Sequence, residues 1–164
     1  MASFYLHDNG CEFSRQCREL ALGLGLGEEQ DPHRATVALA PLLVRILPVH
    51  EYAAPRLGTL IFHPSALPYR RGPDAVRNAV FAGDRVSAAT WFWASTGADE
   101  GPICESQPVV LKPGESAGRA YHTRFVPAGL RALDLALRGI IVGSPRSVPQ
   151  DHDMATYDRR LQTT

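Results

Sequence analysis

Prolines and glycines interrupt this sequence so often that long regular elements have little room. The 164 residues include 13 prolines and 14 glycines, and turn signals recur about every ten residues, as in sandwiches and barrels. Short strands joined by tight turns fit this spacing better than a bundle of helices. The sequence therefore predicts a mainly β fold, an antiparallel β-sandwich with one or two short helices.

The most β-like stretch covers residues 86–95 and reads VSAATWFWAS. Phe92 points to one face while Trp91 and Trp93 point to the other, so both faces carry bulky aromatic side chains. Such a strand is typically central or lies under a partner. We predict that Trp91, Trp93 and Phe92 serve core packing or a subunit interface. Stacking of the two tryptophans on a sugar is the alternative.

Two other stretches carry conflicting patterns. In residues 12–26, Phe13 and Cys17 fit one helical face with Ser14 as a cap, whereas the leucines from position 20 onward alternate with small residues. We favour a helical turn followed by a strand. In residues 133–141, alternating leucines followed by Gly139 favour a last long strand over a competing helix at residues 130–138.

The remaining elements follow from local turn and strand residues. Strands are expected over residues 3–7, 57–63, 108–111 and 120–126, with a strand pair or bent edge strand over 35–49. A hairpin turn is expected at 8–10, and short helices over 73–81 and after Pro149.

The length of the chain suits one domain. We predict a single β-sandwich domain over residues 1–164, in which 1–30 form an N-terminal arm or hairpin and 149–164 a C-terminal tail. The first residues lack the apolar run of a signal peptide, and no stretch approaches a membrane span. Synthesis inside a cell is the resulting expectation.

Charge argues against strong binding of nucleic acid. Seventeen basic and seventeen acidic residues give a formal net charge of zero, whereas a protein that contacts many phosphates normally carries a basic patch or tail. Arg15, Arg18 and Arg34 are the candidates for residues that face RNA. The alternative is a solvated face on which these arginines pair with nearby glutamates: Glu19, Glu28 and Glu29.

One enzymatic motif is present, G-x-S-x-G at residues 114–118, which makes Ser116 a candidate nucleophile. Asp134 and His152 follow in the chain order of α/β-hydrolases. That motif requires a strand before it and a helix after it, but Pro113 precedes it and residues 119–126 resemble a strand. A hairpin turn is therefore the favoured interpretation.

No cofactor or metal site is predicted. The glycines at 23, 25 and 27 do not complete a dinucleotide-binding motif, and His50 lacks the second histidine of a zinc helix. The Asp-His-Asp run at 151–153 is more typical of a solvated helix cap than of a metal site. Three cysteines at no metal-like spacing favour free thiols: Cys11, Cys17 and Cys104. We therefore predict no catalytic residues.

Three segments resemble the single jelly-roll coat proteins of small icosahedral RNA viruses, tymovirus-like ones in particular. Residues 60–65 (LIFHPS) look like a strand with a His-Pro exit, 90–94 (TWFWA) like a second strand, and 133–145 (LDLALRGIIVGSP) like the final strand. The resemblance implies an eight-stranded jelly roll. It also implies a symmetric assembly of copies of the chain, an RNA partner, and residence in a virion after synthesis in the host cytoplasm.

The sequence thus predicts a non-enzymatic structural protein that self-assembles, a coat or capsid subunit enclosing RNA. Assembly is consistent with a sheet protein that must pair or hide its edges. Two alternatives stay open. One is a ligand- or carbohydrate-binding β-sandwich module that uses Trp91 or Trp93, and the other is a serine hydrolase that uses Ser116.

Overall fold

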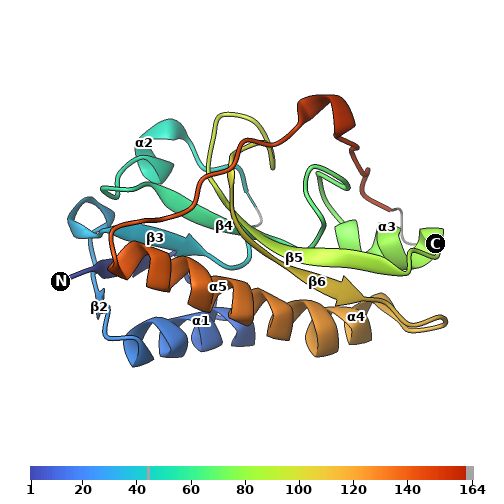
Figure 1. The fold of residues 1–164 in the computed structure, drawn as a ribbon, viewed down its shortest axis with the longest axis horizontal. Coiled ribbons are helices and arrows are strands. Elements are labelled where there is room, and N and C mark those ends of the chain that lie inside the picture. The colour runs from blue at the N-terminus through green and yellow to red at the C-terminus, as the bar shows by residue number, and fades with distance from the viewer. Residues whose placement is uncertain (44, 162–164) are drawn as a thin grey trace.

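Six strands form one mixed sheet in the computed structural model, which describes residues 1–43 and 45–161. Their order across the sheet is β2-β1-β3-β4-β5-β6 (Figure 1). The first four strands in this order are parallel, whereas β5 runs antiparallel to both β4 and β6. The bounds are β1 Ser3–Leu6, β2 Gly27–Glu28, β3 Val37–Ala40, β4 Thr59–His63, β5 Val86–Trp93 and β6 Ile103–Val110.

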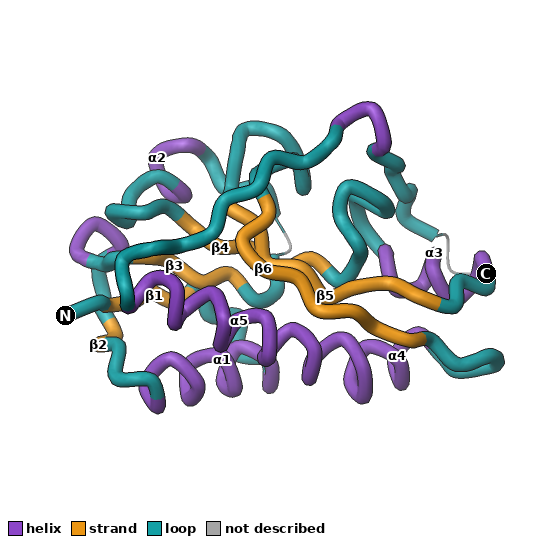
Figure 2. Tube along the Cα trace, viewed as in Figure 1, coloured by secondary structure: helices purple, strands orange, loops and turns teal. Residues whose placement is uncertain are grey.

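Two long helices lie side by side against one face of the sheet, α1 (Glu12–Gly23) and α5 (Val126–Ile141) (Figure 2). The short helix α2 (Val49–Tyr52), several loops and the chain after α5 lie on the other side (Figure 1). The remaining helical segments are α3 Ala75–Ala82, α4 Ala117–Ala120, a π-helical turn Tyr121–Phe125 that leads into α5, and 3-10 turns at Pro32–Arg34 and His152–Met154. In the described part of the chain, every helix is too short or too polar to cross a bilayer.

The predicted antiparallel jelly-roll sandwich is wrong. Three neighbouring strand pairs are parallel, and helices rather than a second sheet cover the apolar face. A parallel pair requires a crossover connection, and α1 makes it between β1 and β2. The strands expected over residues 3–7, 57–63 and 86–95 do occur, as β1, β4 and β5. Their local pattern shows extended structure but not the direction of the neighbouring strand.

Helix α5 replaces the strand predicted over residues 133–141. Leu135, in the middle of the leucine alternation, is 45% exposed, whereas Ala132 and Ala136 are buried. Alternation of leucines misleads here because alanines make up much of the helical stripe. The buried positions recur at helical intervals: Ala132, Leu133, Ala136, Leu137 and Ile140.

Residues 12–26 are helical to Gly23 rather than a helical turn followed by a strand. Phe13, Cys17 and Ala21 recur four residues apart and are buried together. The cap of α1 is Cys11, whose sulfur accepts the N–H of Ser14. Ser14, the predicted cap, is itself buried inside the helix.

Three smaller predictions are also wrong. Residues 8–10 lead from β1 into α1 instead of turning a hairpin, and the strand expected over 120–126 is helical. Residues 35–49 contain β3 and the start of α2 rather than a strand pair, and Val44 lies outside the described residues.

The stretch 1–30 forms β1, α1 and β2, and residues 162–164 of the expected tail also lie outside the described part.

An aromatic cluster joins the sheet to its helices. The ring of Phe62 packs 4.9 Å from that of Phe13 in α1 and 5.4 Å from that of Trp91 in β5. The indole Nε1–H of Trp91 donates to the carbonyl of Gly129 in α5 at 2.8 Å. A Cβ atom at position 129 would lie 2.7 Å from the Phe62 ring, so glycine permits this close approach.

We expect Gly129→Ala to destabilise the protein by about 1–3 kcal/mol, because overpacking displaces the helix from the aromatic cluster. Urea unfolding followed by circular dichroism measures this change. Gly23→Ala is the matched control, since a Cβ there meets nothing within 4 Å; it should be neutral or stabilise by up to about 1 kcal/mol. Equal stability of Gly129→Ala and wild type would contradict the packing described.

Candidate active site

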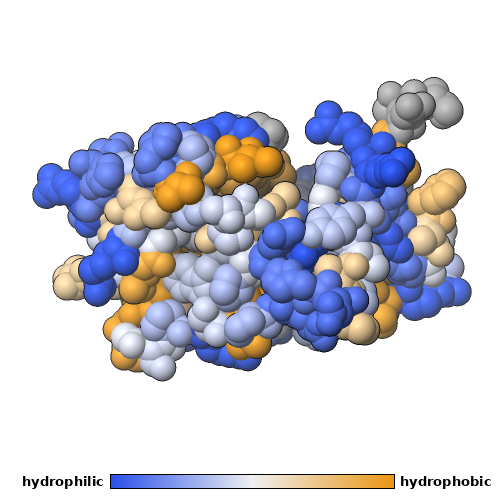
Figure 3. Space-filling model, turned by 90° about the horizontal axis from the view of Figure 1, so that it is seen from above, coloured by the Kyte–Doolittle hydropathy of each residue, from blue (hydrophilic) through white to orange (hydrophobic). Residues whose placement is uncertain are grey.

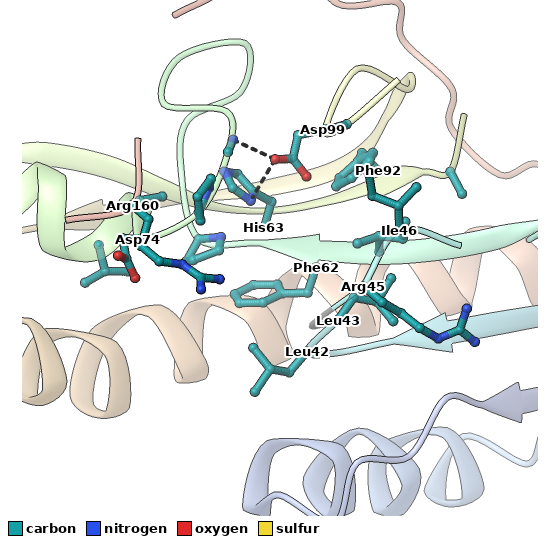
Figure 4. A pocket seen from close by; sticks show the side chains of 18 of the residues that line it. Leu42, Leu43, Arg45, Ile46, Phe62, His63, Asp74, Phe92, Asp99 and Arg160 are labelled. Carbon is teal, nitrogen blue, oxygen red and sulfur yellow. Dashed lines mark hydrogen bonds and ion pairs between the residues drawn. The ribbon is translucent and has the colours of Figure 1, made fainter. Parts of the chain in front are cut away.

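A cavity of about 1010 Å³ lies against β4 and reaches the carboxyl end of that strand (Figure 4). Its walls come from the loop after β3, the last residues of β4, the start of α3 and the loop after β5. Ligands of open α/β sheets commonly bind beyond the carboxyl ends of the parallel strands. The cavity is therefore the first place to look for a functional site.

Two titratable side chains meet at the wall of this cavity, His63 at the end of β4 and Asp99 in the loop after β5. His63 Nδ1 lies 3.7 Å from Asp99 Oδ2, and the two side chains are 9% and 20% exposed. Asp99 Oδ2 also accepts the backbone N–H of Gly72 at 2.8 Å. Figure 4 shows both contacts as dashed lines converging on the carboxylate.

The second nitrogen of His63 is fixed by the backbone. Nε2 lies 2.7 Å from the carbonyl oxygen of Arg70, which can only accept a hydrogen bond. Assigned on this basis, the proton sits on Nε2, and Nδ1 faces Asp99. The site thus places an imidazole nitrogen next to a carboxylate at the cavity wall, and both are side chains of the types that serve as general acids and bases.

The backbone around the pair is strained. Arg70 and Asp99 have φ angles of 55° and 57°, in the left-handed region that side chains other than glycine rarely adopt. Between them, Gly72 has φ 93°, and a Cβ there would lie 2.6 Å from the carbonyl oxygen of Asp158. Strained residues of this kind cluster at functional sites, where the surrounding structure holds them in place.

The rest of the cavity combines apolar walls with basic groups. Leu42 and Ile46, in the loop after β3, are exposed, and Phe92 of β5 also lines the space. Arg45 forms an ion pair with Glu51, and Arg160 enters the lining from the far end of the chain (Figure 4). Such a cavity, with mostly apolar walls and a few charged groups, is typical of small-molecule sites.

The aromatic residues that the sequence suggested as packing or interface residues divide between core and cavity. Trp91 is 0% exposed and lies in the aromatic cluster. Phe92 is 1% exposed and lines the cavity. Trp93 is partly buried, and its Nε1–H donates to the carbonyl of Arg146 at 2.8 Å. Their proposed role at a subunit interface stays a prediction.

The arginines suggested to face RNA lie near carboxylates. Arg15 forms ion pairs with Glu12 and Glu19, and Arg18 pairs with Glu28 at 3.0 Å and with Asp8 at 2.8 Å. Arg34 approaches Glu29 at 3.8 Å. All three glutamates that the alternative interpretation named are therefore partners of these arginines, and exposed pairs of this kind contribute little to stability.

The three residues of the suggested serine hydrolase have other contacts. Ser116 caps α4 by accepting the N–H of Arg119 at 3.2 Å. Asp134 pairs with Arg138 at 2.8 Å along α5. His152 Nδ1 lies 3.2 Å from Arg71 Nη2. The described residues also contain no cluster of three histidines, cysteines or acidic residues able to hold a metal ion.

Sequence reasoning did not identify either member of the pair as functional. His63 was visible only as the residue that ends a strand before Pro64, and Asp99 lies in a loop, GADEG, without a recognisable motif. They lie 36 positions apart in the chain (63 and 99), which leaves no local spacing to find. A histidine that closes a buried strand and is followed by a turn was the one available signal.

Comparison with known proteins assigns the chain to a family. The family model described as formyl transferase matches residues 23–133, well over half of the chain. The chain belongs to the formyl transferase family. A mouse mitochondrial 10-formyltetrahydrofolate dehydrogenase is 31% identical over 124 residues, which cover 76% of this chain and 13% of the mouse protein. A methionyl-tRNA formyltransferase from Caulobacter sp. strain K31 is 35% identical over 126 residues, 77% of this chain and 39% of that protein.

Solved structures show the same fold. HypX from Aquifex aeolicus in complex with tetrahydrofolic acid matches with a TM-score of 0.85 and 18% identity, over 99% of this chain and 30% of HypX. An N-formyltransferase from Helicobacter canadensis in complex with folinic acid and dTDP-3-aminofucose has a TM-score of 0.77 and 13% identity, over 96% of this chain and 71% of that one. The chain thus spans less than half the length of the curated relatives described above.

Family membership corrects the functional predictions made from sequence. The resemblance to viral coat proteins is wrong, and so are the predictions of a capsid subunit, of assembly around RNA and of residence in a virion. The prediction that the chain is not an enzyme is wrong as well, since its relatives are formyltransferases and related folate enzymes. The segments that suggested a coat protein are two strands and a helix of this α/β fold.

A half-buried histidine at the same edge of the sheet makes stability depend on pH. His7 follows β1, and its Nε2 is buried without a hydrogen-bond partner among the described residues. Burial lowers the pKa of His7 below its ordinary value, and the nearby charge of Arg45 lowers it further. The unfolded chain therefore binds this proton more readily than the folded one.

We expect the free energy of unfolding to fall as the pH drops from about 7.5 to about 5, because the folded state resists protonation of His7 below its unfolded pKa. His7→Gln should lessen this dependence, as measured by urea unfolding at each pH. His50→Gln, which changes an exposed histidine in α2, should retain the wild-type dependence. An unchanged pH dependence in His7→Gln would refute the account.

Proposed function

We propose that the His63–Asp99 pair is the reaction centre for transfer of a formyl group carried by a reduced folate. The observation that supports this most directly is the geometry of the pair: an imidazole nitrogen faces a carboxylate at the wall of a large cavity in a chain of the formyl transferase family. The positive φ angles of Arg70 and Asp99 add support, because backbone strain of this kind clusters at functional sites.

The cavity fits the proposed substrate. Its volume of about 1010 Å³ is at the upper end of small-molecule sites. Leu42, Ile46 and Phe92 offer apolar contact to a flat ring, while Arg160 offers positive charge to a carboxylate tail. Two similar proteins were crystallised with a folate, HypX with tetrahydrofolic acid and the Helicobacter enzyme with folinic acid. A formyl-folate supplies a formyl group attached to nitrogen.

The pair manages the protons of the reaction. When an amine or water attacks the formyl carbon, a new bond to carbon forms, the bond from carbon to the folate nitrogen breaks, and one proton passes from the attacking group to that nitrogen. His63 takes and returns this proton at Nδ1. Asp99 stabilises the charged ring, and the carbonyl of Arg70 holds the ring in place through Nε2. The products are the formylated acceptor, or formate, and the free folate.

Turnover of 10-formyltetrahydrofolate labelled with ¹³C in the formyl group tests the proposal. Nuclear magnetic resonance distinguishes the substrate, free formate and a formylated amine. We expect His63→Ala to reduce turnover by about 10²- to 10⁴-fold, the typical effect of removing a general acid–base group. Binding of folinic acid, measured by calorimetry, should survive this substitution because the apolar walls are intact.

His33→Ala is the matched control, since this exposed histidine lies in the turn Pro32–Arg34 and does not line the cavity. It should turn over at the wild-type rate. The proposal fails if the wild-type chain neither binds folinic acid nor consumes the labelled substrate, or if His63→Ala retains full activity.

A further inference from the structure

The chain after α5 crosses the side of the sheet opposite to α5 (Figure 1). It pairs at two points, with Ile103 of β6 and with Arg71 in the loop after β4. Val148 exchanges two backbone hydrogen bonds with Ile103 at the start of β6, at 2.8 and 2.9 Å. Farther along, Arg71 donates to the carbonyl of Thr156 and accepts from the N–H of Asp158. We call residues 148–158 the strap. Seen from above, this side of the molecule is mostly hydrophilic, with small separate apolar patches (Figure 3).

One side chain of the strap, Gln150, points inward and is 6% exposed. Its Oε1 accepts from Arg71 Nε at 3.1 Å and from Arg71 Nη2 at 2.8 Å. Its Nε2 donates to the carbonyl oxygens of Asp99 at 2.9 Å and Gly101 at 2.7 Å. All four hydrogen bonds of this amide therefore join the loop after β4 to the loop after β5.

Both loops contact the His63–Asp99 pair through residues at or next to these hydrogen bonds. Arg71 lies between Arg70, whose carbonyl holds His63, and Gly72, whose N–H holds the Asp99 carboxylate. Gln150 also donates a hydrogen bond to the backbone carbonyl of Asp99 itself. The amide thus provides a second link between the two loops, besides the Asp99 carboxylate itself, and it does not line the cavity.

We propose that Gln150 is a positioning residue that sets the separation of His63 and Asp99, a role that rests on the function proposed above. The buried guanidinium of Arg71 is 1% exposed and transmits the position of the strap to the histidine loop. Tyr157 and His152, also in the strap, contact the same guanidinium at 2.9 and 3.2 Å and hold it in one orientation.

Gln150→Glu distinguishes the hydrogen bonds that Gln150 accepts from Arg71 from those that it donates to the loop after β5. A carboxylate keeps both bonds from Arg71, but it cannot donate to Asp99 or Gly101 and instead places negative charge against their carbonyl oxygens. We expect kcat for labelled 10-formyltetrahydrofolate to fall about tenfold to a hundredfold, as small misplacements of reacting groups do. KM and the affinity for folinic acid should stay within about twofold, because binding contacts are intact. Met154→Ala, an exposed strap residue, should match the wild type throughout.

A second readout does not depend on any activity. The amide hydrogen of Gly72 should exchange slowly with solvent in the wild type, since it is bonded to Asp99, and faster in Gln150→Glu, while the ¹⁵N signals of the His63 ring shift. If the wild type shows no turnover, the proposed function fails, and these signals still decide the positioning role. Fast exchange of Gly72 in the wild type, or Gln150→Glu with wild-type kcat and exchange, would overturn the proposal. Should Gln150→Glu not fold, the wild-type exchange rate remains decisive.

Discussion

The contact of one carboxylate with two loops organises the functional end of this molecule. Asp99 accepts the Gly72 N–H and faces His63, so it links the segment that follows β4 to the segment that follows β5. Because β5 runs antiparallel to β4, Trp93 at its end pairs with Leu60 near the start of β4. The loop after β5 must therefore fold back toward the end of β4 to bring Asp99 to His63. Where these segments meet, the backbone is strained, with positive φ angles at Arg70 and Asp99.

That strain is balanced by contacts made far from the pair in sequence. Arg70 forms ion pairs with Asp84 at 2.6 Å and with Asp158 at 3.2 Å, and Gly72 packs against the backbone of Asp158. The helix side contributes a rigid base, because Gly129 lets α5 reach the aromatic cluster beneath β4 and β5. The site is therefore supported by apolar packing on the α5 side of the sheet and by polar contacts with the strap on the other side.

The sequence predicted the strands best where the local signal is strong. Residues 57–63 and 86–95 are rich in β-branched and aromatic side chains, and both form strands of the sheet. Strand direction was not predictable, because parallel and antiparallel neighbours depend on contacts between residues far apart in the chain. In α5, alternating leucines indicated a strand, but the buried face depends on alanines whose small side chains carry a weak signal.

The site was less accessible to sequence reasoning than the strands. His63 and Asp99 come together through the fold and not through a motif, whereas the one visible motif, around Ser116, proves to be a helix cap. Gln150 illustrates the same point, since nothing local distinguishes a buried bridging amide from a surface glutamine. Only the course of the strap across the sheet gives it four hydrogen bonds to three residues, Arg71, Asp99 and Gly101.

A crystal structure of the chain with folinic acid tests the central claim most directly. The account predicts the ring system between Leu42, Ile46 and Phe92, with the formyl-bearing side of the folate within hydrogen-bond reach of His63. Folinic acid bound elsewhere on the molecule, or in the cavity with its formyl group turned away from His63 and Asp99, would contradict it.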